Sequence, residues 1–228
     1  MARPQSVSIV LAAASATAAC QSQTPLAAGP LVINGSSASG GVATFDVARR
    51  VIATTNNPAD NGTTLALTGK DRGGHAIFET LVLNSTTAPF TFQDFLSVSI
   101  ARISAGTTGT VSLGTNGVAS AAWLPVDPHI IGFSVGIQVS FAGNTASIAI
   151  EGTEDDPDRA YFDALPSGTG VNTAAATTWI VPVAFPLNTA VTSDLLTGTI
   201  IPMIALRLTI NSGATNGPVR MILRQAGI

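Results

Sequence analysis

The stretch that decides the fold is residues 131–141, IGFSVGIQVSF. Apolar side chains occupy every second position, and glycine, serine or glutamine fills each position between them. This period of two places the apolar side chains on one face of a β-strand, whereas a helix would spread them around its axis. Residues 146–151, which follow the pair Gly143-Asn144, alternate in the same way. The sequence therefore predicts a hairpin with one apolar and one polar face.

The same alternation recurs on both sides of this stretch. Residues 65–83 predict a second hairpin with its turn at 71–74, and residues 206–223 predict a third with its turn at 212–217. Further strands are expected at 41–53, 96–104, 110–114 and 178–183. Asn-Gly pairs accept the positive φ of tight turns, and they occur at Asn34-Gly35, Asn61-Gly62, Asn116-Gly117 and Asn216-Gly217.

These patterns together predict an all-β chain. Strands separated by turn signals about every 8–12 residues are typical of an antiparallel β-sandwich or jelly roll. A doubly wound nucleotide-binding fold is not expected, because strands and helices do not alternate. One helical turn is expected around 158–165, within a long loop over 157–188. A seam at 117–125 suggests two β-sandwich-like halves, residues 1–116 and 117–228.

The N-terminal residues 1–25, MARPQSVSIVLAAASATAACQSQTP, allow two interpretations. Arg3, the apolar stretch after it and the ending Thr17-Ala-Ala-Cys20 resemble a signal peptide with a lipoprotein cleavage site. Residues 7–11 instead alternate as a β-strand does. Pro4 and the serines that interrupt the apolar stretch favour the strand, so we expect the mature chain to retain this segment.

The composition excludes several classes of protein. Of the 228 residues, 46% are hydrophobic and 10% are charged, against a usual value of about 25% charged. Disordered chains and coiled coils both need more charge than this. With a net charge of −3 and a single lysine, Lys70, the chain is not expected to bind nucleic acid.

A mean hydropathy of +0.41 is high for a monomer that is surrounded by water. Either a membrane or other protein chains would explain it. The sequence has no run of about 18 consecutive apolar residues, so no membrane-spanning helix is expected. We therefore expect the chain to form homo-oligomers and to bury much of its surface in an assembly. The alternative is a monomer coated with serine, threonine and asparagine.

Motifs that carry chemistry are nearly lacking. The two histidines, His75 and His129, have no metal-binding spacing, and neither a Gly-x-Ser-x-Gly elbow nor a phosphate-binding loop is present. The single cysteine, Cys20, is expected to be a small buried apolar residue. No catalytic residue and no cofactor is therefore predicted, and the chain is not expected to be an enzyme.

Two sets of charged residues remain as candidate sites. The acidic run consists of Glu154, Asp155, Asp156 and Asp158. It is compatible with a solvated turn, with pairing to an arginine of a neighbouring subunit, or with a calcium site, although its spacing is not that of an EF-hand. Arginine is enriched at interfaces, so five arginines are candidate interface residues, with solvated strand ends as the alternative: Arg49, Arg50, Arg207, Arg220 and Arg224.

Several strings in the chain resemble structural proteins of tailed bacteriophages. They are GVATFDVARRVIATT (41–55), NGTTLALTGKD (61–71), ETL (79–81), WLPVD (123–127), FSVGIQV (133–139), EDDP (154–157), ALRLTINSG (205–213) and the ending QAG (225–227). The resemblance covers most of residues 31–228. It implies a non-enzymatic virion component and does not say which part of the particle. We expect a capsid decoration protein, or otherwise a neck or tail component.

The partners implied by this resemblance are other virion proteins, such as the major capsid protein or neck and tail proteins. The chain would be assembled into the virion in the cytoplasm of the host bacterium. The alternative is a secreted or lipid-anchored bacterial β-sandwich binding module, which would be cleaved before Cys20. A β-sandwich hydrolase is disfavoured, because the histidine and serine arrangements of hydrolases are missing.

Overall fold

The computed structural model describes residues 4–129, 134–141, 146–153, 189–191, 195–199, 204–213 and 217–226. Nearly all elements in these ranges are β-strands, and the helical element among them is the short 3₁₀ turn η1 (Pro58–Asp60). The prediction of an antiparallel all-β fold is thereby confirmed. No helix within the described ranges is both long and apolar enough to cross a membrane.

The chain forms two compact units. Of the described residues, the N-terminal unit holds 13–116, and the C-terminal unit holds 4–12 and all those from 117 onward. Residues 4–12 therefore lie outside the half in which the sequence placed them, because β1 (Gln5–Ile9) pairs with β16 (Val219–Ala226) near the other end of the chain. Strand β9 (Val111–Ser120) contributes its first residues to one unit and its last residues to the other.

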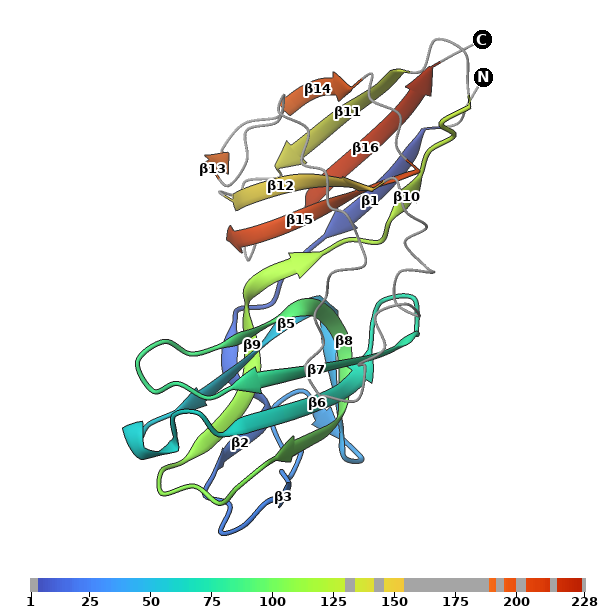
Figure 1. Ribbon diagram of the computed structural model, residues 1–228. Helices are drawn as coiled ribbons and strands as arrows, with labels where there is room; N and C mark the ends of the chain where they lie inside the picture. The colour runs from blue at the N-terminus through green and yellow to red at the C-terminus, as the bar shows by residue number, and fades with distance from the viewer. Residues whose placement is uncertain are drawn as a thin grey trace. The chain divides into compact units, whose positions relative to one another are not determined.

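The N-terminal unit is a curled antiparallel sheet with the strand order β9-β5-β8-β6-β7 (Figure 1). Further strands extend it, with β2 on β9 and the two-residue strands β3 on β8 and β4 on β5. Its strands are β2 (Ser15–Gln23), β3 (Gly29–Pro30), β4 (Ala38–Ser39), β5 (Val42–Thr55), β6 (Thr64–Lys70), β7 (Ala76–Val82) and β8 (Phe90–Ile103). The hairpin predicted for residues 65–83 is confirmed as β6 and β7. Its inward face carries Leu65, Leu67, Ile77 and Leu81, all buried.

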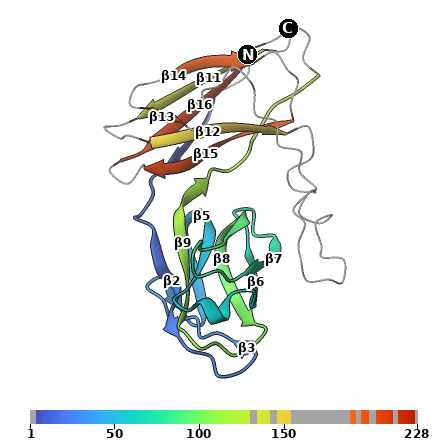
Figure 2. The ribbon, with the colours of Figure 1, turned by 60° about the vertical axis from the view of Figure 1, so that its left-hand side comes forward.

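The C-terminal unit is a sandwich of two layers (Figures 1 and 2). One layer has the order β1-β16-β11-β14, and the other contains β13-β12-β15 with β10 and the end of β9 alongside β15. The strands are β10 (Leu124–Pro125), β11 (Ser134–Phe141), β12 (Ala146–Thr153), β13 (Thr189–Val191), β14 (Leu195–Thr199) and β15 (Ala205–Gly213). The core draws on both layers through Ile137, Val139 and Met221 of the first and Ile150 and Leu208 of the second, all at most 1% exposed.

Two of the three predicted hairpins are wrong in their pairing. Strand β11 pairs with β14 and β16, while β12 pairs with β13 and β15, so these consecutive strands lie in opposite layers. The same holds for β15 and β16 near the C-terminus. Each strand has the apolar face that the sequence predicted. An apolar face is buried equally well whether the next strand along the chain pairs with it in the same layer or lies in the opposite layer. Alternation alone therefore does not determine which strands pair.

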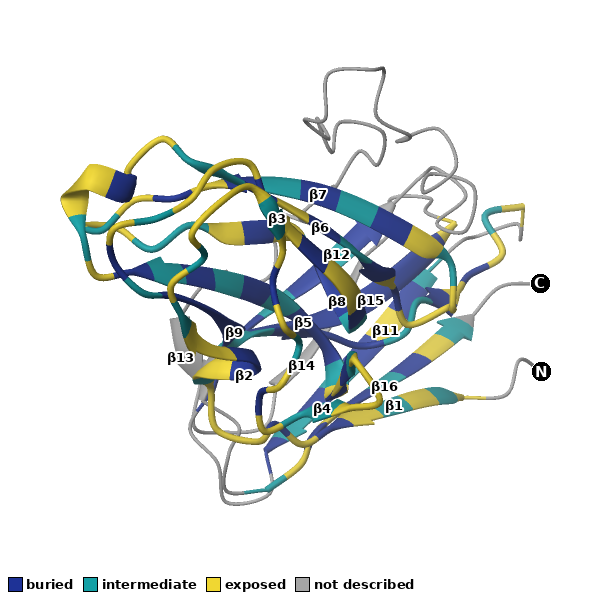
Figure 3. Ribbon diagram, turned by 90° about the horizontal axis from the view of Figure 1, so that it is seen from below, coloured by how far each residue is buried: buried dark blue, intermediate teal, exposed yellow. Residues whose placement is uncertain are grey.

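The segment at residues 7–11 is confirmed as a strand and its continuation. Ile9 and Leu11 are buried, whereas Ser6 and Ser8 are exposed, and this alternation is visible along β1 in Figure 3. The turn predicted at Asn61-Gly62 is also present, since Gly62 has a φ of +89°.

Asn116-Gly117 was predicted as a turn but lies inside β9, because strand pairing overrides its local turn preference. Four other expectations fall wholly or partly outside the described residues: the strand at 178–183, the helical turn at 158–165, the loop at 157–188 and the turn at Asn216-Gly217.

Candidate functional site

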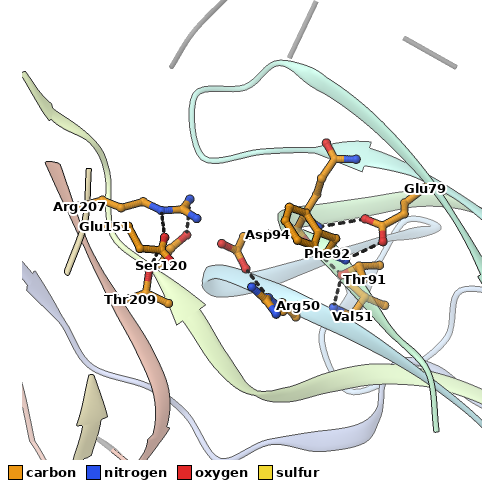
Figure 4. A network of polar contacts seen from close by, with 11 residues as sticks. Arg50, Val51, Glu79, Thr91, Phe92, Asp94, Ser120, Glu151, Arg207 and Thr209 are labelled. Carbon is orange, nitrogen blue, oxygen red and sulfur yellow. Dashed lines mark hydrogen bonds and ion pairs between the residues drawn. The ribbon is translucent and has the colours of Figure 1, made fainter. Parts of the chain in front are cut away.

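A buried carboxylate joins two strands of the N-terminal unit. Glu79 occupies an inward position of β7 and is 8% exposed. Its two oxygens accept hydrogen bonds from the backbone N–H groups of Phe92 (2.6 Å) and Gln93 (3.0 Å) in β8 (Figure 4). The amide of Gln93 in turn donates to the carbonyl oxygen of Phe78 (2.9 Å). We call this set of three bonds the Glu79 latch, because side chains here replace a main-chain ladder between β7 and β8.

The latch places an ionisable group in a dehydrated position. Burial raises the pKa of the Glu79 carboxyl above its ordinary value of 4.5, and the negative charge of Asp94 acts in the same direction. The two backbone N–H donors and the positive charge of Arg50 oppose this rise without cancelling it. Glu79 therefore has a structural role in the sheet, and its protonation is coupled to folding because its pKa is raised.

Next to the latch, Arg50 of β5 lies between two half-exposed aromatic rings. Its guanidinium is 5.8 Å from the ring centre of Phe90 and 5.7 Å from that of Phe92, and the rings are 51% and 47% exposed. The Nε atom lies 3.8 Å from Oδ1 of Asp94, which is an ion pair too long for a hydrogen bond. We call Arg50, Phe90 and Phe92 the Arg–Phe patch.

An irregularity in the sheet produces this patch. The register between β5 and β8 shifts between Arg50 and Ile52. The hydroxyl of Thr91 bridges the gap, because it accepts from the N–H of Val51 (2.8 Å) and donates to the carbonyl of Gln93 (2.8 Å). Thr91 is thus fully buried, and the rings before and after it point outward. Aromatic and arginine side chains in this arrangement are typical of protein–protein contacts.

A second polar cluster lies within the C-terminal unit. Nε of Arg207 donates to Glu151 (2.7 Å), and the hydroxyl of Thr209 donates to the same carboxylate oxygen (3.0 Å). Arg207 also donates to the hydroxyl of Ser120 (3.3 Å; Figure 4). Its guanidinium lies 4.8 Å from the ring centre of Trp123. This cluster ties β12, β15, β9 and the segment before β10 together, so its geometry is accounted for by structure.

Another buried carboxylate closes a loop in the N-terminal unit. Asp60 at the end of η1 is 3% exposed and accepts from the hydroxyl of Thr55 (2.9 Å) and the backbone N–H groups of Thr108 (2.7 Å) and Gly109 (3.0 Å). Burial acts to raise the pKa of Asp60, but the three donors together outweigh it, and the pKa lies below its ordinary value of 3.8. The ionised carboxylate thus joins η1 to the loop before β9. We call these three hydrogen bonds the Asp60 clasp.

The remaining chemistry-bearing residues have structural roles. Cys20 in β2 is fully buried, as predicted, and burial raises the pKa of its thiol to about 12. His75 contacts Asp71 (3.1 Å) in the turn between β6 and β7, and the backbone N–H of His129 donates to Asp127 (2.9 Å). Among the described residues, no group of three or more His, Cys, Asp or Glu side chains is placed to hold a metal ion. The acidic run at 154–158 lies outside those residues.

The five candidate interface arginines are divided between the two units. Arg49 is 1% exposed and forms two 2.6 Å bonds to Asp46, and Arg207 belongs to the polar cluster above. Arg50 is part of the Arg–Phe patch. Arg220 and Arg224 are exposed on β16. Arg49 and Arg207 therefore use their charge inside the chain, Arg50 is partly buried beside Asp94, and Arg220 and Arg224 lie where a partner can reach them.

Sequence reasoning missed the Glu79 latch, the Asp60 clasp and the exposed rings of Phe90 and Phe92. Glu79 did carry a signal, because it stands among the inward apolar residues of its strand, where a charge needs partners. Asp60 and the two phenylalanines carried none, since their environment depends on pairing between distant segments. The sequence matches no protein-family model, and no curated protein is significantly similar to it.

Proposed function

We propose that this chain is a non-enzymatic structural protein of a tailed-bacteriophage virion, and specifically a decoration protein that binds the outside of the capsid. A neck or tail component is the related alternative. The observation that carries the proposal is the outward face of β6, β7 and β8, where exposed apolar and small polar side chains outnumber the charged residues Lys70 and Arg102. Neighbouring residues on this face are Thr68, Phe78 and Ile100 in one row and Ala66, Thr80 and Arg102 in the next.

Large apolar side chains of this face are exposed to solvent, with Val82 54% exposed and Ile100 50% exposed. Surfaces of free domains are typically about 25–35% charged. A sheet face built mainly from threonine, alanine and large apolar residues fits a surface that is covered by another protein. Repetition on a shell lets many weak contacts of this kind add up.

The placement of the carboxylates gives further support. Seven of the 13 acidic residues lie within the described ranges, and each has a partner inside the chain. They are Asp46, Asp60, Asp71, Glu79, Asp94, Asp127 and Glu151. These contacts explain why the carboxylates are present without invoking a substrate. We accordingly infer a mechanical role, with other virion proteins as partners.

The lipid-anchored alternative and the virion role differ in whether the N-terminal strand is kept. It requires cleavage before Cys20, which would remove β1 from its pairing with β16 and place a lipid on a fully buried side chain. The proposal instead needs β1 in place. Intact-mass measurement of native material separates the two, because a lipidated Cys20 would contradict the virion role.

The direct test is mass spectrometry and electron microscopy of purified phage particles that carry this gene. A decoration protein is expected at a copy number that scales with that of the major capsid protein, with added density on the outer shell. A few copies at one vertex would instead indicate the neck or tail. Absence of the protein from purified particles would overturn the proposal.

A further inference from the structure

Strand β1 lies at the edge of its sheet. Among the residues that the structure describes, β1 (Gln5–Ile9) pairs with β16 alone (Figure 3). In an antiparallel pair, the N–H and C=O groups of every second residue point away from the partner strand. Strand β10 of the opposite layer is reached by a side chain of β1, since the amide of Gln5 donates to the carbonyl oxygen of Pro125 (2.9 Å). Within the described residues, the outer main-chain groups of β1 are therefore left for another strand.

This edge lacks the features by which proteins protect their edge strands. Edge strands are commonly protected by charged residues, by proline, by a β-bulge or by being very short. The sequence of β1, QSVSI, holds neither a charge nor a proline, and its five residues are an ordinary strand length. Its register with β16 runs without a shift. Such an edge is a template on which a strand of another chain can pair.

The inner face of β1 is incompletely buried at the same edge. Val7 lies on the inner face together with Ile9, yet Val7 is only partly buried, whereas Ile9 is fully buried. Met221, which faces Val7 from β16, is also fully buried. Because β16 covers one side of Val7, a strand added on the other side would cover the rest.

We propose that β1 pairs in antiparallel orientation with β1 of a second copy of this chain, about a twofold axis at Val7. The sequence of the strand favours that occupant, because β1 is self-complementary. With Val7 opposite Val7, each Ser6 faces Ser8 of the other copy, so polar side chains meet polar side chains and no like charges meet. The axis is perpendicular to the sheet, so both inner faces lie on the same side and two four-stranded sheets join into one.

The test is sedimentation velocity of the full chain over a concentration series. The proposed register places position 6 of one copy opposite position 8 of the other, twice in each dimer. Ser6→Glu/Ser8→Glu therefore brings like charges together and should weaken self-association at least about tenfold. Ser6→Lys/Ser8→Glu brings opposite charges together and should associate at least as tightly as the wild type. Both variants place the same glutamate beside Arg220, so that contact inside the chain does not distinguish them.

The central strand β11 supplies a matched control. Gln138 and Ser140 face the same two residues of β16 as Ser6 and Ser8 do, but from the other side of that strand. Gln138→Glu/Ser140→Glu thus repeats the charge change next to the same neighbours, away from the edge of the sheet. This control should associate like the wild type.

Two further measurements address the geometry of the pairing. A mixture of Ser6→Glu/Ser8→Glu chains with Ser6→Lys/Ser8→Lys chains should form mixed dimers, although each variant alone associates weakly. Val7→Cys chains should form a disulfide between copies under mild oxidation, since opposed residues of antiparallel strands have Cα atoms about 4.5–5.5 Å apart. Val10→Cys, at an exposed position away from the axis, is the control and should stay uncrosslinked. The native Cys20 is fully buried and takes no part.

The inference is overturned if the wild-type chain is monomeric at all concentrations. It is equally overturned if the two charge variants associate alike, if the β11 control loses association as Ser6→Glu/Ser8→Glu does, or if associated Val7→Cys chains stay uncrosslinked. Circular dichroism of each variant confirms that the fold is intact. The pairing goes beyond the proposed function and does not rest on it. A chain found in phage particles but monomeric in solution would reject the pairing and leave the virion role standing.

Discussion

Replacing Glu79 with alanine is expected to destabilise the N-terminal unit by about 2–4 kcal/mol. The substitution removes the acceptor of two backbone N–H groups, at Phe92 and Gln93. A hydrogen bond to a charged group contributes roughly 1.5–3 kcal/mol, so two bonds set an upper limit of about 6 kcal/mol. The expected loss is smaller, because Phe92 is 47% exposed and water can replace part of the contact. The dehydration that raises the pKa of Glu79 also reduces the net gain in the wild-type chain.

Glu79→Gln retains one carbonyl oxygen and should cost about half as much, roughly 1–2 kcal/mol. Val82→Ala is the control on the same strand, since its side chain points outward and is 54% exposed, and it should change stability by less than about 1 kcal/mol. Because the chain has two units, a single unfolding free energy is not well defined. Native-state hydrogen exchange resolves the units separately. Unchanged protection of the Phe92 and Gln93 amides in Glu79→Ala would refute the latch.

The raised pKa of Glu79 also fixes the sign of a pH effect. The ordinary value of 4.5 applies to the unfolded chain, and the folded value lies above it. The stabilisation linked to the protonated form is therefore complete below pH 4.5 and is lost as the pH rises through the folded pKa. The stability of the wild-type chain relative to Glu79→Gln should increase as the pH falls from 7 towards 4.5. A decrease over that range would show that burial does not control this group.

Three further predictions concern other buried residues. Asp60→Asn should destabilise the N-terminal unit by about 1–3 kcal/mol. Because the pKa of Asp60 is lowered from 3.8, that difference should be complete above pH 3.8 and shrink as the pH falls through the folded value; a pH-independent difference would contradict the clasp. Ile137→Asp should prevent folding of the C-terminal unit, whereas Gln138→Asp on the opposite face should be tolerated; circular dichroism showing equal damage would refute the alternation. With a pKa of about 12, the Cys20 thiol should react with Ellman's reagent only after unfolding, so rapid reaction of the native chain would refute its burial.

The sequence predicted strands and their faces well, because burial of one face is encoded residue by residue. Ile137 and Val139 alternate with Gln138 and Ser140 in the structure as they do in the sequence. Pairing partners were harder to predict. The hairpin of β6 and β7 follows from a four-residue turn, but β11 and β12 bury equally apolar faces from opposite layers. Partner choice there depends on the free energy of the whole sandwich, which no local pattern carries.

The candidate site was less predictable than the fold. A charge at an inward position, as at Glu79, shows that a partner must exist but does not name it. The partner is a pair of N–H groups released by a shift of register in β8, and such a shift depends on which strand lies alongside. Arg207 shows that a charge at an outward position can also be buried. It stands at an outward position of β15, yet it is 6% exposed because Glu151 and Trp123 lie against it.

The scarcity of charge in this chain connects its stability to its proposed assembly. The ion pairs of Arg49 with Asp46 and of Arg207 with Glu151 are short and involve buried arginines, so added salt screens them little. Arg220 and Arg224 are exposed, and added salt strongly screens charges at such positions. Raising the salt concentration should therefore weaken contacts that these exposed charges make between copies well before it unfolds either unit. If salt destabilised folding and association in parallel, the charges that hold the fold and those that hold the assembly would not be separate sets.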